Sequence, residues 1–141
     1  MPLDPDRDFT PLRIAVLTLS DSRTLAQDTS GSFLVSALQD AGHTLAARQL
    51  IPDDAHVLRE QLSAWADDAD IDVVLTTGGT GITRRDITPD VVEDIATKVI
   101  PGFGELFRML SYETIGTSTI QSRALAALVG RTLVFALPGS T

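Results

Sequence analysis

The sequence has 141 residues and a formal net charge of −8, which argues against general nucleic-acid binding because that function needs a basic face. It contains no cysteine and only two histidines, which excludes disulfides and thiolate chemistry and argues against a histidine-rich zinc site. No apolar run approaches the roughly 20 residues of a membrane helix and the acidic N-terminus is unlike a signal peptide, so we expect a cytoplasmic protein with no membrane partner.

The chain begins with a polar, proline-containing stretch and then alternates between apolar runs and helical patterns. Residues 1–11 predict a flexible arm, followed by a single domain over residues 12–141. The apolar run 12–20 predicts a buried strand, residues 21–30 a loop, and residues 44–51 a second strand.

Two helices are predicted in this half from apolar residues at helical spacing. Gly42 ends the first helix, whose apolar positions are Phe33, Leu34, Ala37, Leu38 and Ala41. The turn Pro52-Asp53-Asp54 breaks the chain and caps the second, whose predicted buried stripe is Ala55, Leu58, Leu62 and Trp65.

The second half predicts two further strands, at residues 71–77 and 131–137. Thr88-Pro89 is a helix-start signal, and the helix it begins is expected to run to about residue 99. The resulting order of elements predicts an α/β protein with a mostly parallel sheet and helices on both faces.

Two more helices are predicted between these strands. Pro101-Gly102 interrupts the chain, and a helix over residues 105–112 is expected to turn Leu106, Met109 and Leu110 inward. Ser118 and Gln121 fit a capping box for a further helix through about residue 128.

The most informative segment is TTGGTGITRRDITP, residues 76–89, which follows the third predicted strand. Gly78, Gly79 and Gly81 allow positive φ angles and a close approach of the backbone to a ligand. Backbone amides gathered in such a turn can hold an anion such as phosphate. The alternative interpretation is a purely structural connection.

Two common phosphate motifs do not fit this turn. A P-loop ends in Gly-Lys-Ser/Thr, whereas the only lysine of the chain is Lys98. In a dinucleotide fingerprint Arg84 would stand where the third glycine belongs. The entire net negative charge lies in residues 1–72, so the half with the glycine turn repels an anion less.

Several polar loops are expected to meet at one edge of the sheet. Ligands of parallel sheets bind at the carboxyl ends of the strands, and loops that follow predicted strands converge there. Besides the glycine turn and Asp86, the loops at this edge contribute Ser20, Asp21, Asp53, Pro138, Gly139 and Ser140.

The charged residues near this edge and on the helix that follows also have simpler, structural interpretations. Asp86 can hydrogen-bond its own loop, and Asp53 can cap the helix that follows it. Glu105 and Arg108 can form a surface ion pair three residues apart on a helix. The Arg84-Arg85 pair can either clamp phosphates or be solvated.

The combination of motifs resembles the MoaB/MogA family of molybdenum-cofactor biosynthesis proteins, related to the G domain of gephyrin. The resemblance extends over about residues 12–141 and is closer to the MoaB branch in residues 113–123. Its carrying segments are TTGGTG at 76–81, RDITP at 85–89, PGFGE at 101–105 and LPGS at 137–140.

The resemblance implies a three-layer α/β/α sandwich that binds molybdopterin and adenylylates it with ATP and Mg²⁺, releasing pyrophosphate. It also leaves open a catalytically inactive molybdopterin carrier. In the family a C-terminal helix follows the Pro-Gly-Ser turn, beyond Thr141. The positions implied for substrate binding are Ser20, Asp21, Thr77, Gly78, Gly79, Thr80, Gly81, Glu105, Ser111, Pro138, Gly139 and Ser140, and those implied for catalysis are Asp53 and Asp86.

The chemistry of that reaction favours a metal role for the two aspartates. The attacking phosphate monoester has a second pKa of about 6, so no strong general base is required. Carboxylates beside a polyphosphate would increase repulsion unless they held a divalent cation. Asp53 and Asp86 are therefore expected to bind Mg²⁺, directly or through water.

The resemblance further implies a homo-trimer or a homo-hexamer built from trimers, with the hexamer slightly favoured. Large apolar residues are concentrated near the expected site, at Phe103, Leu106, Phe107, Leu110 and Tyr112. One helix buries only one stripe against its own sheet, so some of these side chains are expected to face a neighbouring subunit.

Overall fold

A computed structural model describes residues 3–139, within which six strands form one sheet in the order β2-β1-β3-β6-β5-β4. Strands β2, β1, β3 and β6 are parallel, whereas β5 runs antiparallel to both β6 and β4. The mostly parallel sheet predicted from the sequence is confirmed. The strands are β1 (Arg13–Leu19), β2 (Thr44–Ile51), β3 (Val73–Thr77), β4 (Lys98–Ile100), β5 (Leu125–Val129) and β6 (Thr132–Leu137).

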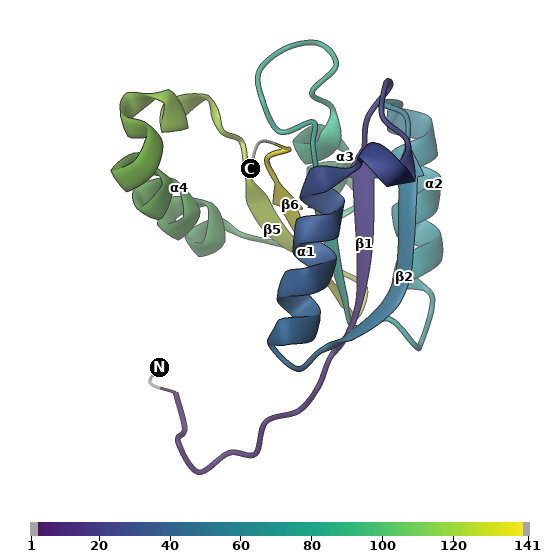
Figure 1. Ribbon diagram of the computed structural model, residues 1–141, viewed down its shortest axis with the longest axis vertical. Helices are drawn as coiled ribbons and strands as arrows, with labels where there is room; N and C mark the ends of the chain where they lie inside the picture. Colours follow the sequence, from purple (N-terminus) through teal and green to yellow (C-terminus); the bar gives the residue numbers. More distant parts are fainter. Residues whose placement is uncertain (1–2, 140–141) are drawn as a thin grey trace.

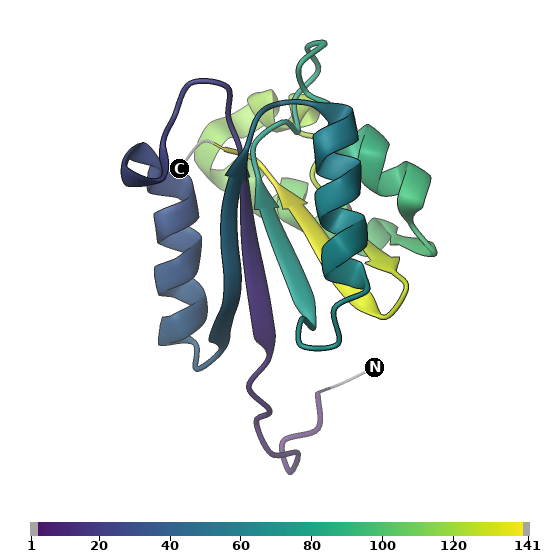
Figure 2. The same cartoon turned by 90° about the vertical axis from the view of Figure 1, so that its right-hand side faces the viewer.

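Helices cover both faces of the sheet, which gives the three layers expected (Figure 1). Helix α1 lies on one face and α2 on the other, as the side view in Figure 2 shows. No described helix is long and apolar enough to cross a membrane. The helices are η1 (Leu25–Gln27), α1 (Thr29–Asp40), α2 (Ala55–Ala66), α3 (Thr88–Ile95), α4 (Pro101–Ile115) and η2 (Gly116–Gln121), where η marks a 3₁₀ helix.

The larger core lies between the sheet and helices α2 and α3. Leu58, Leu62 and Trp65 of α2 are buried there as predicted, whereas Ala55 is exposed. On the opposite face Leu38 of α1 packs in a second, smaller core. Strands β1, β3 and β5 are almost fully buried, which explains their nearly continuous apolar sequences.

The first predicted helix exists but is turned relative to the expected stripe. Leu34 and Leu38 face the sheet, whereas Phe33 is 65% exposed and Ala37 is also exposed. The buried residues in its first turn are Ser30 and Gly31, not apolar side chains. The loop expected up to residue 30 is also shorter, because η1 and the start of α1 lie within it.

The prediction for the segment after α3 was wrong in two places. Helix α3 ends at Ile95 instead of continuing to about residue 99, because the backbone of Ala96 is extended and leads into β4. Pro101 does not interrupt a helix but occupies the first turn of α4, where its missing N–H has no intrahelical partner to lose.

Two further helical predictions were wrong. Leu106, Met109 and Leu110 of α4 were expected inward but are 53%, 62% and 54% exposed. The helix predicted through about residue 128 is replaced by η2 and the strand β5, which is buried between β4 and β6. Pairing with two neighbouring strands outweighs the helical preference of its alanine and leucine residues.

The described part of the N-terminal arm, from residue 3, lies outside the sheet and contacts the domain through Phe9. The ring of Phe9 packs against His43 at 5.2 Å between centroids, and Nδ1 of His43 accepts a hydrogen bond from the backbone N–H of Leu12 at 3.0 Å. The flexibility of the arm, residues 1–11, stays a prediction.

Candidate functional site

The parallel strands bring four loops to one edge of the sheet, as their order in the sequence predicted. The backbone N–H of Asp53 donates to Oδ1 of Asp21 at 2.9 Å, which joins the loops after β1 and β2. Oγ1 of Thr77 donates to the Pro138 carbonyl at 3.1 Å, which joins those after β3 and β6. These loops form a common rim over the carboxyl ends of the strands.

The glycine turn requires its glycines for two separate reasons. Gly78 and Gly79 have φ angles of 103° and 72°, a region that side-chain-bearing residues rarely adopt. A Cβ at Gly81 would lie only 2.7 Å from Oδ2 of Asp86, so this glycine allows the carboxylate to lie against the turn. Thr88 completes the turn by donating from Oγ1 to the Gly78 carbonyl at 3.0 Å.

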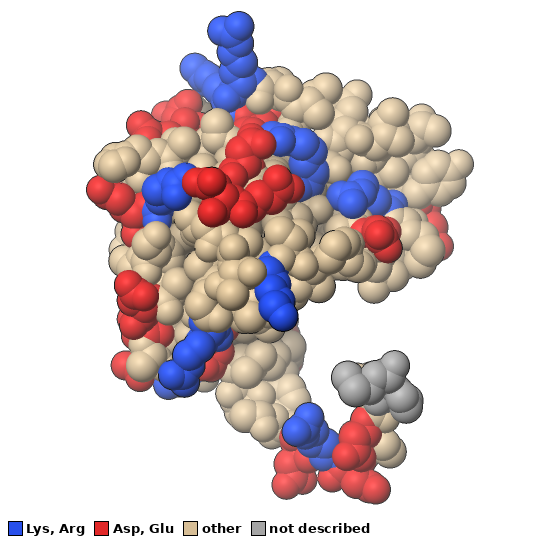
Figure 3. Space-filling view, turned by 180° about the vertical axis from the view of Figure 1, so that it is seen from behind, with Lys and Arg blue, Asp and Glu red and all other residues tan. Residues whose placement is uncertain are grey.

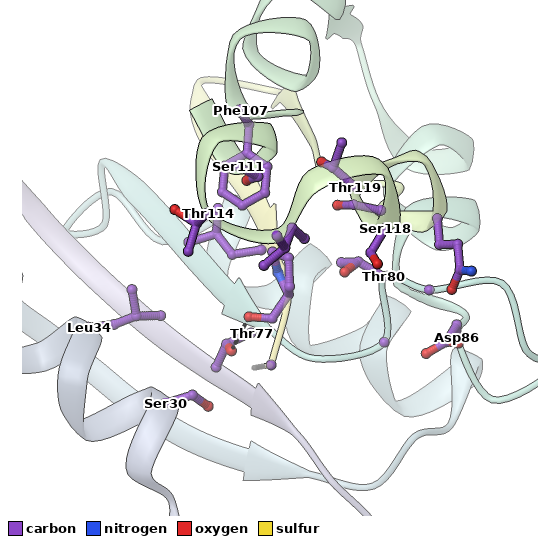
Figure 4. A pocket seen from close by; sticks show the side chains of 18 of the residues that line it. Ser30, Leu34, Thr77, Thr80, Asp86, Phe107, Ser111, Thr114, Ser118 and Thr119 are labelled. Carbon is purple, nitrogen blue, oxygen red and sulfur yellow. Dashed lines mark hydrogen bonds between the residues drawn. The ribbon is translucent and has the colours of Figure 1, made fainter. Parts of the chain in front are cut away.

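A pocket of about 660 Å³ opens between α1, the glycine turn and the α4–η2 segment. Figure 4 shows Phe107 and Ser111 on one wall, Ser30 and Leu34 on the other, and Asp86 at the margin. Both hydroxyl-bearing and apolar side chains line it. The lining is Ser30, Phe33, Leu34, Thr77, Gly79, Thr80, Gly81, Asp86, Phe107, Ser111, Thr114, Ile115, Ser118, Thr119, Gln121, Ser122, Leu137, Pro138 and Gly139.

Most of the predicted binding residues meet in this pocket. Its described lining does not include Ser20, Asp21, Asp53, Gly78 or Glu105, and Ser140 lies outside the described residues. The predicted residues that do line it are Thr77, Gly79, Thr80, Gly81, Asp86, Ser111, Pro138 and Gly139. Their roles in binding stay predictions.

Asp53 lies in an environment that disfavours its charge. Partial burial raises the pKa of this carboxyl, and repulsion from Asp21 and Asp86 raises it further, although Arg85 opposes the change. Arg85 also pairs with Asp21 at 3.4 Å. The capping interpretation of Asp53 was wrong, because the carboxylate of Asp54 accepts from the first amides of α2.

Asp86 is held charged by its own loop. Its Oδ2 accepts from the backbone N–H of Thr83 at 2.9 Å and from Oγ1 of Thr83 at 2.8 Å. Burial alone would raise the pKa of Asp86, but these bonds, the Gly81 amide and nearby Arg123 lower it overall. Asp86 therefore does hydrogen-bond its own loop, as the simpler interpretation predicted. The same bonds keep its carboxylate ionised at the margin of the pocket.

The carboxylates at this edge fit a loosely held cation better than a preformed metal cage. Among residues 3–139 no three His, Asp or Glu side chains are grouped closely enough to form such a cage. Asp53 nevertheless experiences the charges of both Asp21 and Asp86. An excess of carboxylate charge with few direct ligands suits Mg²⁺, which keeps several waters and binds one or two carboxylates.

Two arginines make contacts that were not predicted from the sequence. Arg108 does not pair with Glu105; its Nη1 donates to the carbonyls of Ser122 and Ala124 at 3.3 and 3.0 Å. Arg123 was not singled out, although it contacts the glycine turn and lines a second cavity of about 400 Å³ with Arg84 and Asp86. No periodicity or motif signals such a contact, because it joins segments about forty residues apart in the sequence.

The face formed by α2 and α3 carries acidic and basic side chains close together (Figure 3). Arg59 of α2 pairs with Asp94 of α3, and Arg123 pairs with Asp90 at 3.0 Å. Because both signs alternate on this face, attraction of an anion depends on local groups at the glycine turn.

The fold and the pocket define an α/β protein with a pocket of small-molecule size at the carboxyl edge of its sheet. The family described as "Probable molybdopterin binding domain" matches residues 15–141. Molybdenum cofactor biosynthesis protein B of Escherichia coli K12 is 47% identical over 134 residues, covering 95% of this chain and 79% of that protein.

Solved structures agree with the sequence comparison. A crystal structure of molybdenum cofactor biosynthesis protein B superposes with a TM-score of 0.91 at 43% identity, covering 95% of this chain and 84% of that one. The MoaB structure from Thermus thermophilus, described as a molybdopterin biosynthesis enzyme, gives a TM-score of 0.81 at 34% identity, covering 92% and 82%. The chain therefore belongs to the MoaB family of molybdenum cofactor biosynthesis proteins.

Proposed function

We propose that this protein acts in molybdenum cofactor biosynthesis by binding molybdopterin and adenylylating it with Mg-ATP. The observation that carries the proposal is the glycine turn with the ionised Asp86 at the margin of a large pocket. Family membership supplies the substrate, since a related structure is described as a molybdopterin biosynthesis enzyme. The volume of about 660 Å³ is within the range of pockets that hold cofactor-sized ligands.

The pocket offers different surroundings to the two ends of a pterin phosphate. Phe107 and Leu34 supply apolar surface for a flat ring system, and the neighbouring hydroxyls of Ser111 and Thr114 supply hydrogen-bond partners. In this proposal backbone amides of the glycine turn would hold the terminal phosphate.

In the proposed reaction an oxygen of that phosphate attacks the α-phosphorus of ATP. The bond between this phosphorus and the bridging oxygen to the β-phosphate breaks, and pyrophosphate leaves with the electron pair. The attacking group is mostly dianionic at neutral pH, so the protein needs no general base. Its task is to align two anions and to reduce their repulsion.

Asp86 and Asp53 would hold the magnesium ion, directly or through water, and the bound ion would neutralise charge at the α-phosphate. Asp86 suits this task because hydrogen bonds keep it ionised. Asp53 suits it because a cation would relieve the repulsion that it experiences from Asp21 and Asp86.

The direct test is an adenylylation assay with purified protein, molybdopterin, ATP and Mg²⁺. We expect adenylylated molybdopterin and pyrophosphate in equal amounts, with both absent when Mg²⁺ is chelated. Folded protein that forms no product above background would refute the proposed activity.

A second candidate function is a molybdopterin carrier without chemistry. It is favoured by the place of Asp53 outside the pocket lining. Calorimetry distinguishes the two: a carrier binds molybdopterin tightly and does not bind Mg-ATP, whereas the enzyme binds both.

A further inference from the structure

The first two turns of α1 line the large pocket with residues that were not predicted for the site. Ser30, Phe33 and Leu34 all line it, and their spacing of three and four residues places them on one face of the helix. In Figure 4 Ser30 and Leu34 lie on α1, on the side of the pocket opposite Phe107. This face of α1 is therefore available to a bound ligand.

Phe33 carries an aromatic ring that the core does not use. Its side chain is 65% exposed, whereas Leu38 of the same helix is buried in the smaller core. On the α4 side of the pocket Ile115 is 53% exposed and also lines the cavity. A flat ring bound between α1 and α4 would cover apolar surface on both sides, and this burial favours binding.

The hydroxyl group of Ser30 is oriented by a buried charge. Its Oγ lies 3.5 Å from Oδ1 of Asp28, whose side chain is fully buried. Burial alone would raise the pKa of Asp28, but its hydrogen bonds and the nearby charge of Arg48 lower it overall, so the carboxylate is ionised. At 3.5 Å the bond is weak, but the negative charge still turns the hydroxyl hydrogen toward Asp28. Ser30 therefore has only lone pairs left for a ligand.

Other polar groups on this side of the pocket have the same polarity. Thr77, at the end of β3, donates from Oγ1 to the Pro138 carbonyl at 3.1 Å, so it also offers only lone pairs. Among the described residues that line the pocket, Asp86 is the only one with an ionisable side chain, and it is ionised. These acceptors favour a ligand edge that carries N–H groups, and the negative charge disfavours a phosphate deep in the pocket.

We propose that α1 recognises the ring of the ligand, with Phe33 packing against its face and Oγ of Ser30 accepting a hydrogen bond from an N–H group on its edge. The inference rests on the proposed function for the identity of the ring as a pterin, whose pyrimidine half carries an amino group and a ring N–H. An acceptor at this place selects an amino-substituted ring over an oxo-substituted ring of the same size, because two acceptors would repel each other.

The test compares two flat rings, pterin and lumazine, in the whole protein. They share one bicyclic frame, but lumazine has an oxo group where pterin has the amino group. Packing on Phe33 is therefore nearly the same for both, whereas Ser30 meets a donor in one and an acceptor in the other. Titration followed by the fluorescence of each ring gives the two affinities and their ratio.

The variants are Ser30→Ala and Phe33→Ala, each with a matched control. Ser36→Ala removes an exposed hydroxyl from the same helix, at a residue outside the pocket lining. Phe9→Ala removes a ring that is 63% exposed but belongs to the N-terminal arm. Melting temperatures of all four variants show that each is folded.

We expect Ser30→Ala to weaken pterin binding about tenfold and to leave lumazine within about twofold of wild type, since one hydrogen bond is lost with pterin only. Phe33→Ala should weaken both rings by a similar factor of about ten and keep the preference for pterin. Both controls should stay within about twofold of wild type for both rings.

Three results would overturn the inference. They are an unchanged preference for pterin in Ser30→Ala, an unchanged affinity in Phe33→Ala, and folded wild-type protein that binds the two rings equally or binds neither. A merely structural role of Ser30 would weaken both rings together and leave their ratio intact, so the ratio identifies the contact.

The outcome is separable from that of the proposed function. Wild-type protein that forms no adenylylated molybdopterin, while Ser30→Ala still loses the preference for pterin, would refute the reaction and retain the recognition by α1. Active wild-type protein with an unchanged preference in Ser30→Ala would retain the reaction and refute the recognition.

Discussion

Neighbouring aspartates after β2 have opposite effects on stability. Asp54 caps α2, accepting from the N–H groups of His56 and Val57 at 2.9 and 3.1 Å. Asp53 instead faces the other site carboxylates, and partial burial together with their repulsion raises its pKa. Asp54 therefore stabilises the fold, whereas the ionised form of Asp53 destabilises it, as is common for functional groups.

Asp53→Asn is expected to stabilise the protein at neutral pH. A carboxyl whose pKa is raised in the folded state destabilises the fold when ionised; this cost is present above the folded pKa and disappears as the pH falls below the ordinary value of about 3.9. The melting temperature of the variant should therefore exceed that of wild type at neutral pH, and the difference should shrink toward pH 4. Calorimetry over this range checks it, and a lower melting temperature at neutral pH would contradict it.

Asp54→Ala should have the opposite effect. Loss of the N-cap leaves two amides of α2 without their acceptor and is expected to lower the free energy of unfolding by about 1 kcal/mol. Urea unfolding measures this, with Asp54→Asn as the control because asparagine is an equally good cap. A full loss in Asp54→Asn would show that charge, not capping, is the cause.

Asp86→Asn tests the proposed metal role directly. Asparagine keeps an oxygen for the Thr83 bonds but removes the charge, so Mg²⁺-dependent turnover should fall by about 10²-fold or more. Molybdopterin affinity should remain near that of wild type. Steady-state kinetics at several Mg²⁺ concentrations decide the matter, and unchanged turnover would leave Asp86 with its loop-stabilising role alone.

At the scale of elements, helix α1 begins on a buried charge. The Asp28 carboxylate accepts from the backbone N–H of Gly31 at 2.9 Å, from Thr18 at 2.5 Å and from Arg48 at 3.2 Å. A Cβ at Gly31 would lie only 2.0 Å from this carboxylate, which explains the glycine in the first turn of the helix. Since Ser30 lines the pocket, this cluster also supports one pocket wall.

Asp28→Asn is expected to destabilise the protein by about 3 kcal/mol, because it leaves Arg48 partly buried without its counter-charge. Burial would raise the pKa of Asp28, but bonds from Thr18, Gly31 and Arg48 lower it overall, so its contribution is lost as the pH falls through the folded value. Urea unfolding at neutral pH provides the measurement. Asp40→Asn at the exposed end of α1 is the control, and an equal effect there would contradict the argument.

The sequence predicted the elements whose periodicity and burial agree. Strands β1, β2, β3 and β6 and helix α2 were located because continuous apolar runs or a clear stripe define them. Strands β4 and β5 were missed for physical reasons. β4 has only three residues, and β5 reads LAALV, whose strand conformation depends on pairing with distant neighbours.

The same reasoning explains what could be predicted of the site. The meeting of Asp21, Asp53 and Asp86 followed from the rule that loops after parallel strands converge. The pocket wall from α4 and η2 did not follow, because it depends on how those helices pack. Arg123 was missed for a similar reason, since its partners in the loop of Gly81 and Asp86 are backbone carbonyls, which have no sequence signature.

At the scale of the whole molecule, α4 is an unusual helix. It projects beside the sheet, away from α1 (Figure 1), and Gly104 is its only buried residue in the described structure. Phe103 reaches the sheet by packing edge-on against Phe135 at 5.1 Å between ring centroids. Phe107 stacks on Phe103 at 5.9 Å between centroids. Among the described residues, the other large apolar side chains of the helix are more than half exposed; they are Leu106, Met109, Leu110, Tyr112 and Ile115.

The exposed side chains of α4 lead us to predict a homo-oligomer in which α4 contacts a neighbouring subunit. The family resemblance adds the expectation of threefold symmetry, with a hexamer slightly favoured over a trimer. Leu106, Met109, Leu110 and Tyr112 are 53–62% exposed, and contiguous apolar surfaces of this kind mark protein interfaces. Light scattering of the purified protein should give three or six times the subunit mass. Leu110→Glu should reduce it by burying an unpaired charge, whereas Leu25→Glu, at a similarly exposed site on η1, should not. A monomeric mass at micromolar concentration would refute the prediction, and a dimer would rule out the threefold axis.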